Sequence, residues 1–276
     1  MFRQRSGSSL CYACGKLNRV DASVCFYCGR RNPGLWGFGP VIGRLVGGLD
    51  FAALVTVVAV TAYIASLALD PRSALAPRGV FDLFAPGGSA LLALGMAGAV
   101  PWQAGHWWTV VTAIYLHGSL LHILFNLLWI RQLLPDVEGV YGQARTIVIF
   151  TLSGAAGFLL SNAAGNPFTL GASGAVFGVL GAMVWYGRRR GGLFGAAVLR
   201  QYGSWALILF VVGLLPGMRV DNWGHAGGFL GGVLVALLLG AGDQHPERGI
   251  HRVLAAACLA LTAAAFALQL WTAFAP

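Results

Sequence analysis

Charged side chains are scarce in this sequence, and acidic ones are the scarcest. Asp, Glu, Lys and Arg make up 10% of the 276 residues, nine residues are acidic, and 57% are hydrophobic. Soluble globular domains carry about 25% charged residues. This shortage excludes a soluble globular protein, and the long uncharged runs predict an all-α polytopic membrane protein that lies in a lipid bilayer.

An apolar run near the start of the chain is also lacking. The first such run begins only at residue 51, so no secretory signal peptide is expected and the preceding tail is predicted to be cytoplasmic.

Cysteine is rare as well, and four of the five cysteines lie in this tail. In a reducing compartment, paired cysteines indicate metal ligands before disulfides. Cys258 is interpreted as an ordinary small apolar residue.

The net charge of +9 would suit nucleic-acid binding, but its distribution does not. Basic residues cluster in the tail and in a predicted short loop at 188–190, as the positive-inside rule expects. With the tail inside, only Arg72, Arg78 and Arg219 of the 18 basic residues face outward. We therefore expect an integral protein of a bacterial cytoplasmic membrane, with a cytoplasmic N-terminus and no nucleic-acid partner. The seven predicted spans are 51–69, 119–134, 147–164, 172–186, 206–215 with an N-terminal extension, 225–240 and 253–274.

The connection at 70–116 is predicted to be a long outer loop, partly embedded in the membrane interface. Its apolar piece at 91–100 is too short to cross the bilayer, and Trp102, Trp107 and Trp108 suit the headgroup boundary. No internal repeat is evident, which counts against a transporter built from inverted repeats.

Residues 1–34 carry two C-x-x-C pairs, Cys11 with Cys14 and Cys25 with Cys28. Four thiolates at this spacing predict a tetrahedral Zn²⁺ site in a zinc-ribbon-like module, in which a following glycine completes each turn. Two disulfides or a redox pair are the alternatives. So short a module has almost no core, so the metal would supply most of its folding energy. Tethering, regulation and docking of a cytoplasmic protein partner all stay open, and 35–48 is predicted to be a linker or interfacial segment.

Several polar residues lie in or beside the predicted spans, where they are costly and indicate function. His122 and Asn126 are four residues apart and share one helix face, with His117 just before them. In the predicted topology His122, Asn126, Ser173 and His225 all fall in the outer half of the membrane. Interhelical hydrogen bonding without chemistry is the alternative for each residue alone. For the set, we favour a single site.

Ser173 lies in the turn Gly171-Ala172-Ser173-Gly174 at the start of a predicted helix. A serine is a poor core residue and a candidate nucleophile, and the glycine before it permits a tight turn. Unpaired N–H groups at a helix N-terminus favour negative charge, so an oxyanion formed beside Ser173 would find donors aimed at it.

Glycines explain how Ser173 and His225 would meet. Gly174 and Gly178 lie on one predicted span, and Gly224, Gly228 and Gly232 form a ridge of small residues on another. Such ridges let helix backbones approach closely. Phe177 is one turn from Ser173, where it either flanks the imidazole of His225 or packs against core or lipid.

Over residues 91–232 the sequence resembles the rhomboid intramembrane serine proteases. The resemblance depends on a set of motifs in a fixed order, and their combination is specific although each alone is weak. They are His117 with His122 and Asn126, then Glu138 with Gly142, the Gly171-x-Ser173-Gly174 turn, and His225 with Gly227-Gly228 and Gly232.

The resemblance implies a rhomboid-like six-helix core, a catalytic membrane domain at 49–240, followed by an additional seventh transmembrane helix at 250–274. It implies that Ser173 is the nucleophile and His225 the general base, without a carboxylate and without a cofactor. His122, Asn126 and the Ser173 N–H would form the oxyanion hole, supported by His117 and Gly171. Glu138 would be a structural anchor. Substrates would be transmembrane proteins with small or helix-destabilising residues near the outer boundary.

Two positions depart from the family pattern. Thr109 follows Trp108 where the family usually has arginine, so the anchoring of the outer loop is expected to differ. Phe177 replaces a frequent tyrosine, which removes a hydroxyl but allows ring stacking. The rival functions are a non-catalytic rhomboid-like protein that binds transmembrane clients and a transporter or channel whose buried histidines shuttle protons.

Overall fold

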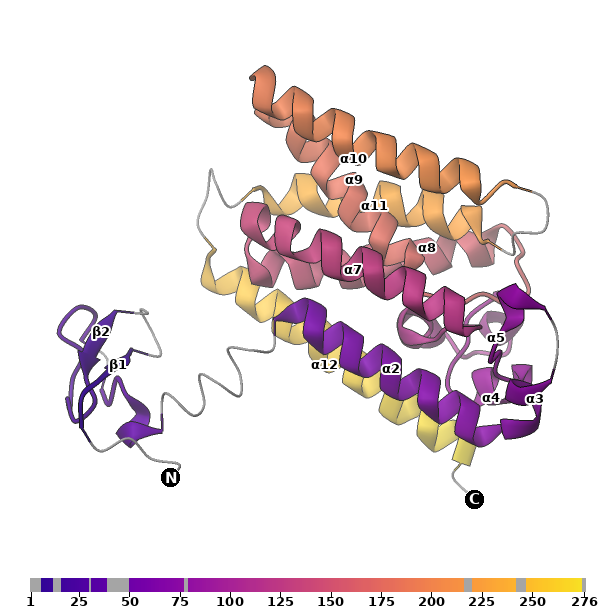
Figure 1. Ribbon diagram of the computed structural model, residues 1–276, viewed down its shortest axis with the longest axis horizontal. Coiled ribbons are helices and arrows are strands. Elements are labelled where there is room, and N and C mark those ends of the chain that lie inside the picture. The colour runs from indigo at the N-terminus through magenta and orange to yellow at the C-terminus, as the bar shows by residue number, and fades with distance from the viewer. Residues whose placement is uncertain are drawn as a thin grey trace. The chain divides into compact units, whose positions relative to one another are not determined.

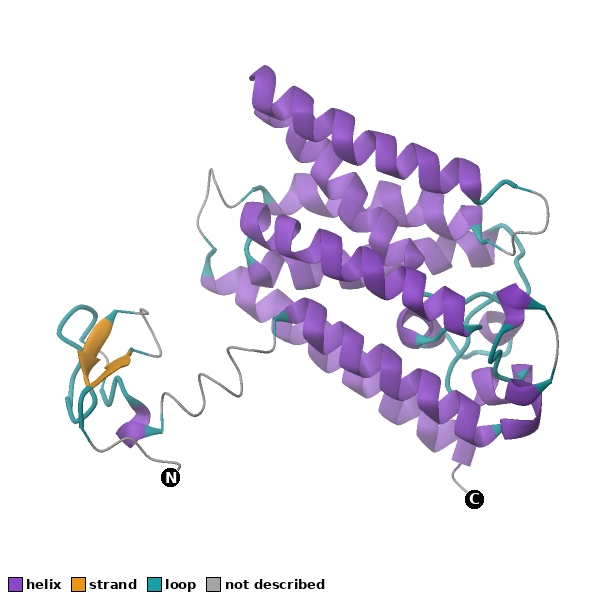
Figure 2. Cartoon of the chain, in the orientation of Figure 1, coloured by secondary structure: helices purple, strands orange, loops and turns teal. Residues whose placement is uncertain are grey.

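The computed structural model describes residues 6–11, 16–29, 31–38, 50–76, 79–215, 220–241 and 247–274. The chain divides into two units, Met1–Leu54 and Val55–Pro276. In the described residues both strands belong to the first unit, whereas the second is built of helices and their connections (Figure 2). Cys14, most of the predicted 35–48 linker, and Arg78 and Arg219 lie outside the described residues.

The first unit is a small two-stranded structure. β1 (Ser8–Leu10) pairs antiparallel with β2 (Leu17–Arg19), with Ser8 opposite Arg19 and Leu10 opposite Leu17. A short 3-10 helix, η1 (Leu35–Gly37), follows. The middle residues of the strands, Ser9 and Asn18, are buried, but both are polar. A unit with so few buried apolar side chains needs another source of folding free energy.

The second unit contains long helices, and a series of short ones connects the first two of them (Figure 1). The long helices are α2 (Phe51–Leu69), which begins just before the unit boundary, α7 (Leu120–Tyr141), α8 (Gln143–Ala163), α9 (Ser173–Arg190), α10 (Gly192–Val212), α11 (Asn222–Leu239) and α12 (Gly249–Phe274). The short ones are α3 (Pro71–Leu75), η2 (Val80–Asp82), α4 (Gly88–Ala93), α5 (Ala99–Gln103), α6 (Thr109–Thr112) and η3 (Ala113–Tyr115).

Six of the described helices are long and apolar enough to cross a membrane: α2, α7, α8, α10, α11 and α12. The remaining span of the seven predicted is α9, which has 18 residues and ends in three arginines. Because of these arginines, α9 is too polar to count as a membrane span by composition. Its residues from Gly174 to Met183 are nevertheless all buried in the protein. The protein is therefore an all-α polytopic membrane protein, as its composition predicted.

Helices α8, α9 and α11 form the centre of the bundle and pack on one another. α7 and α10 both contact α9, and α12 packs on α8 and also reaches α6 and α4. α2 lies against α7, where Ala59 and Tyr63 meet Ile123. The helix that begins at Ser173 is thus held on several sides by other helices.

Polar caps and glycines set the ends of the helices around the centre. Ser119 accepts a hydrogen bond from the His122 N–H at 3.3 Å and so begins α7. Gly142, at φ +86°, ends α7 and begins α8, and Gly191, at φ +64°, separates α9 from α10. Left-handed backbone of this kind favours glycine.

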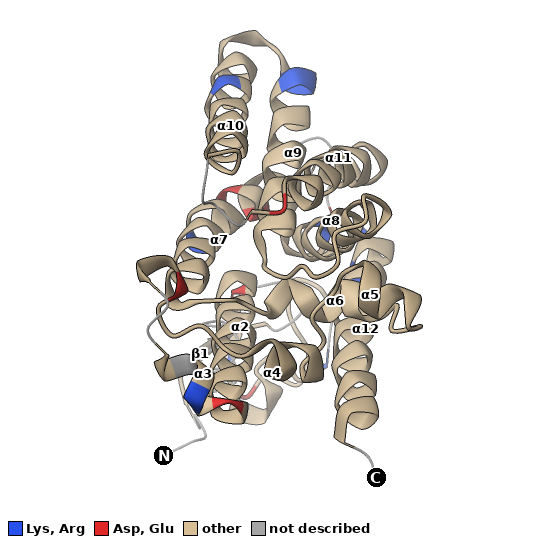
Figure 3. Cartoon of the chain, turned by 90° about the vertical axis from the view of Figure 1, so that its right-hand side faces the viewer, with Lys and Arg blue, Asp and Glu red and all other residues tan. Residues whose placement is uncertain are grey.

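In its described residues, the connection between α2 and α7, which the sequence predicted as a long loop, is a series of short helices. The apolar piece at 91–100 contains the end of α4 and the beginning of α5, and neither crosses the bundle. Figure 3 faces the end of the bundle at which α3, α4, α5 and α6 gather. Charged residues in that view are scattered over a mostly uncharged ribbon, consistent with the low charged content of the sequence.

Several predicted boundaries differ from the structure: α8 and α12 each begin four residues before the predicted 147 and 253, and α7 and α9 end later than predicted. Residues Arg188, Arg189 and Arg190 form the last turn of α9 and not a loop, because Gly191 is the residue that ends the helix. Basic side chains at a helix C-terminus also interact favourably with its dipole. α7 continues through Pro135 to Tyr141, seven residues beyond the predicted end.

Candidate active site

Ser173 is the first residue of α9, and the turn before it requires glycine. Gly171 has φ +124°, and its N–H donates to the Ala113 carbonyl at 2.9 Å. No described side chain caps the helix, and the first backbone bond of its opening turn runs from the Val176 N–H to the Ala172 carbonyl. The N–H groups that precede it are therefore donors without an intrahelical acceptor, close to the Ser173 hydroxyl.

The backbones of α9 and α11 touch along the two predicted glycine rows. A Cβ built on Gly228 would collide with the Gly174 carbonyl, and one built on Gly232 would collide with the Gly178 carbonyl. A Cβ on Gly174 itself would lie 3.4 Å from the Gly224 carbonyl oxygen. The predicted close approach of these helices is confirmed, and it fixes the height of His225 relative to α9.

His225 is buried and stacks on Phe177 of α9, with ring centroids 4.2 Å apart and ring planes at 16°. The predicted flanking of the imidazole by Phe177 is confirmed. Phe177 follows Ser173 by one helical turn, or about 6 Å along α9, so both side chains share one face of that helix. The imidazole therefore lies against the face of α9 that carries the serine.

Ser173 and His225 form no hydrogen bond with each other or with another side chain among the described residues. The Nδ1 atom of His225 is buried without a partner. Among the described residues no carboxylate bonds to this ring, and stacking on Phe177 is the side-chain contact that holds it. Catalytic hydrogen bonds are often long before substrate binds.

Asp221 precedes α11 and was not among the predicted site residues. Its Oδ1 accepts from the Gly224 N–H at 2.9 Å and from Asn166 Nδ2 at 2.8 Å, and its Oδ2 accepts from Thr169 Oγ1 at 2.6 Å. The carboxylate thus joins the loop before Ser173 to the helix that carries His225. An Asp directly before a helical segment is a recognisable N-cap signal, but its partners in the loop were not predictable from it.

The His122 ring fills the space beside Gly171. A Cβ on Gly171 would lie 2.8 Å from both Cε1 and Nε2 of His122, and 3.8 Å from Ser173 Oγ. The Gly118 N–H donates to His122 Nδ1 at 3.3 Å. Because Nδ1 is then an acceptor, the neutral ring carries its proton on Nε2. A hydrogen-bond donor therefore faces the turn that leads into Ser173.

His117 and Asn126 both contact His122. The His117 ring is fully buried and packs edge-on against His122, with centroids 5.1 Å apart. Burial lowers the pKa of His117 well below its ordinary value, and the nearby His122 lowers it further, so His117 is neutral. Asn126 is buried and donates one amide hydrogen to the His122 carbonyl at 2.9 Å. Its amide nitrogen keeps a second hydrogen for another acceptor.

An open apolar groove of about 420 Å³ adjoins His225 between α9, α10 and α11. Phe177 and His225 form part of its wall, together with Phe210 of α10 and Phe229 of α11. Apolar space therefore reaches the imidazole from the side of α10.

This geometry agrees with comparisons to known proteins. Residues 104–242, about half of the chain, match the family model described as the rhomboid domain. The chain belongs to the rhomboid family. All the predicted catalytic and oxyanion-hole residues lie inside the matched range, whereas the cysteines of the first unit and all of α12 lie outside it.

Similar rhomboid proteins occur in bacteria and in parasites. The chain is 34% identical over 167 residues to rhomboid protease GluP of Bacillus subtilis, covering 59% of this chain and 31% of that protein. It is 35% identical over 160 residues to rhomboid-like protease 3 of Toxoplasma gondii, covering 54% and 58%. With rhomboid protease GlpG of Salmonella newport it shares 33% identity over 133 residues, 48% of each. The chain thus spans less than two thirds of the length of these relatives.

The two departures from the rhomboid pattern have different structural outcomes. Thr109 is buried, and its hydroxyl donates only locally, to the His106 carbonyl at 2.7 Å. Phe177 keeps the stacking on His225 without a hydroxyl. Glu138, the predicted anchor, lies one turn before Gly142 in α7. At Gly142 the backbone packs closely against the side chain of Glu247, which a Cβ at this position would strike. The anchoring role of Glu138 stays a prediction.

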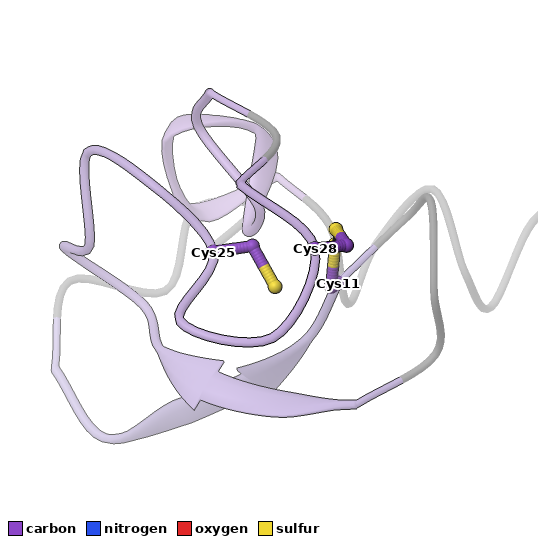
Figure 4. Close-up of side chains that lie close together, drawn as sticks. All are labelled: Cys11, Cys25 and Cys28. Atoms are coloured by element: carbon purple, nitrogen blue, oxygen red, sulfur yellow. The ribbon is translucent and has the colours of Figure 1, made fainter.

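The first unit brings three of the four predicted metal ligands together (Figure 4). The sulfur atoms of Cys11, Cys25 and Cys28 lie within 4.8 Å of one another, and those of Cys11 and Cys28 are 3.8 Å apart. Zn–S bonds of about 2.3 Å in a tetrahedron give S···S edges of about 3.8 Å, whereas a disulfide needs about 2.05 Å. Gly29, at φ +68°, completes the second turn as predicted, and its N–H donates to the Cys25 carbonyl. The three thiols therefore fit a zinc site that Cys14 would complete.

Proposed function

We propose that this rhomboid protein is an intramembrane serine endopeptidase that uses Ser173 and His225 to cleave transmembrane substrates. The main support is the stacking of His225 on Phe177, which shares a helix face with Ser173. The glycine contact between α9 and α11 leaves no room for a side chain that would separate the two helices.

In the first half of the reaction, the Ser173 oxygen attacks the carbonyl carbon of the scissile peptide bond and His225 accepts the hydroxyl proton. The tetrahedral intermediate then collapses, the C–N bond breaks, and His225 returns its proton to the leaving amine. An ester between Ser173 and the substrate remains. In the second half, His225 takes a proton from water, the hydroxide attacks the ester, and Ser173 leaves with that proton.

The oxyanion would be stabilised by donors around the Gly171 turn. His122 is the strongest candidate because its Nε2 hydrogen faces Gly171, with the N–H of Ser173 and the remaining amide hydrogen of Asn126 as further donors. His117 would support the His122 ring from behind. Removing one donor from such a site typically costs about 10²–10³ in kcat.

We place the site toward the outer face of a bacterial cytoplasmic membrane, with the N-terminus cytoplasmic. The argument is the clustering of basic residues in the tail and at the end of α9. The catalytic membrane domain would comprise residues 49–240, and the helix at 250–274 would be an addition. Substrate helices would have to unwind locally near the outer boundary, where small or helix-breaking residues make unwinding cheaper.

The test uses the purified full-length protein, a fluorophosphonate probe and a labelled transmembrane substrate. We expect the wild type to be labelled and to cleave, and Ser173→Ala and His225→Ala to do neither. Ser66→Ala is the matched control, because Ser66 is also buried in a span but bonds only to the Tyr63 carbonyl. Labelling of Ser173→Ala would remove the assignment. A wild type that captures the substrate without labelling or cleavage would instead support a non-catalytic client-binding protein.

For the first unit, we propose that Cys11, Cys14, Cys25 and Cys28 bind one structural Zn²⁺. The sulfur spacing and the hydrogen bond from Asn18 Nδ2 to Cys25 Sγ at 3.3 Å support it, since such bonds stabilise a thiolate. Elemental analysis of reduced protein should give one zinc per chain for the wild type and much less for Cys25→Ser. Cys258→Ser, in α12, should keep the full zinc content, and a wild type without metal would refute the site.

A further inference from the structure

A buried glutamine links α12 to the connection between α2 and α7. Gln269 is 3% exposed in an otherwise apolar stretch of helix. Its Oε1 accepts from the indole Nε1 of Trp108 at 2.8 Å, and its Nε2 donates to the carbonyls of Leu92 and Ala93, both at 3.0 Å. Both amide hydrogens are thus used. A buried primary amide is costly unless it is satisfied in this way.

Gln269 satisfies carbonyls at the end of α4, where a helix has few further N–H groups of its own to offer. The Leu92 carbonyl also accepts from the Gly95 N–H at 3.0 Å, whereas Gln269 is the described donor to the Ala93 carbonyl. Gly95 follows at φ +98°, and a Cβ there would press on Thr112 and lie 3.1 Å from Gln269 Cγ. The Thr112 hydroxyl donates to the Gly95 carbonyl at 2.7 Å. We call this set the Gln269 junction: Leu92, Ala93, Gly95, Trp108, Thr112 and Gln269.

The segment that the Gln269 junction holds also contacts the loop before Ser173. Residues 94–113 run from the end of α4 into η3. The Thr169 N–H donates to the Ala97 carbonyl at 2.8 Å, and the Gly171 N–H donates to the Ala113 carbonyl at 2.9 Å. One face of the 94–113 segment is therefore bonded to α12, and two of its carbonyls hold the turn that sets Ser173.

We propose that Gln269 is a positioning residue: through the 94–113 segment, α12 holds the Gly171 turn and with it the Ser173 hydroxyl. The effect on catalysis rests on the proposed function. The structural part, that Gln269 holds the Gly171 turn, does not depend on it. In the described residues, the hydrogen bonds between α12 and residues 92–108 are made by Gln269, because Trp108, Leu92 and Ala93 all bond to this one side chain. Beyond the 94–113 segment, Tyr115 bonds separately to Thr262 of α12.

The structural part is tested by hydrogen–deuterium exchange on the full-length protein. Gln269→Leu keeps the volume but removes all three hydrogen bonds. We expect at least tenfold faster exchange in peptides covering 95–113 and 166–174, with α11 and α10 unchanged within twofold. Leu270→Ala, at the neighbouring and partly exposed position of α12, is the control and should change neither segment. Equal acceleration in every helix, or in α12 alone, would overturn the inference.

The catalytic part is tested by the rate of fluorophosphonate labelling and by substrate cleavage. We expect Gln269→Leu to label Ser173 about tenfold more slowly and to lower kcat by a similar factor, with KM unchanged within twofold. Trp108→Phe should slow labelling less, and the double variant should be no slower than Gln269→Leu within twofold, because both changes break one network. Labelling of Gln269→Leu at the wild-type rate would overturn the positioning role.

The two parts separate failure of this inference from failure of the proposed function. If the wild type is not labelled, the serine protease proposal falls, and exchange at 166–174 still decides whether Gln269 holds the Gly171 turn. If the wild type is labelled and Gln269→Leu exchanges like the wild type, the proposed function stands and the inference is wrong.

Discussion

The contact between α9 and α11 differs in kind from the contact between α12 and the connection at 94–113. The first is made where side chains are missing, since Gly174 and Gly178 face Gly228 and Gly232 with their backbones in contact. The second is made by one long polar side chain, Gln269, that reaches carbonyls and an indole across the gap. Both lie in an environment where burying apolar surface against lipid gives little driving force between helices.

The difference shows two ways of fixing an element in a membrane. Close backbone contact fixes the distance and height of the helices, and any added atom must displace a helix. A hydrogen-bonded junction holds a connection made of short helices, and we expect its loss to leave the long helices in place. The proposed serine lies between the two, on α9 but after a turn that the connection holds. The four predictions that follow test this contrast, from the largest expected effect to the smallest.

The largest effect is expected at the α9–α11 contact. Gly228→Ala places a methyl group on the Gly174 carbonyl, so the free energy of unfolding in mixed micelles should fall by about 3 kcal/mol or more. Gly139→Ala in α7, where nothing lies within 4 Å of the new Cβ, should leave stability equal or higher by up to about 1 kcal/mol. Similar losses in both variants would show that the glycines matter through helix propensity and not through contact.

Asp221→Ala should come next, with a loss of about 2–3 kcal/mol. It removes an N-cap and leaves the Asn166 and Thr169 side chains without their carboxylate acceptor. Asp70→Ala, which removes the cap of the short helix α3, should cost about 1 kcal/mol. Thermal unfolding of the two variants gives the comparison, and equal shifts would mean that the bonds to the loop before Ser173 contribute nothing.

A smaller effect on stability is expected when Phe177 is shortened. Phe177→Leu removes the ring that stacks on His225 and should cost about 1 kcal/mol. No other described side chain bonds to the imidazole. We therefore expect the rate of Ser173 labelling to fall by a larger factor than a loss of about 1 kcal/mol would produce. Phe194→Leu, on an exposed face of α10, should change neither quantity. Unchanged labelling in Phe177→Leu would mean that stacking does not position His225.

The smallest effect is expected at the edge of the Gln269 junction. Thr112→Val removes the single hydrogen bond to the Gly95 carbonyl and should cost about 1 kcal/mol or less. Exchange should rise in residues 95–113 but not in α9 or α11. If hydrogen exchange in α9 rose as much as in residues 95–113, the α9–α11 contact and the Gln269 junction would not be independent of each other.

The sequence was sufficient for the features that depend on local composition. Lack of charge predicted the membrane, the Gly171–Ser173 turn predicted the start of α9, and the glycine rows predicted the close helix pair. The ends of α7 and α9 were missed by four to seven residues, because α7 continues past Pro135 and α9 continues through three arginines that were assigned to a loop. The stacking of Phe177 on His225 was one of two open alternatives until the structure decided it.

What the sequence alone determined is the chemistry available: a serine after a glycine turn, histidines in apolar helices, and paired cysteines in a polar tail. What only the tertiary structure decided is which groups hold them. Gln269 bonds to carbonyls 176 and 177 residues away, and Asp221 bonds to side chains 52 and 55 residues away. The sequence shows a glutamine or an aspartate but not its partner, because a buried hydrogen bond depends on where two distant backbones meet in space.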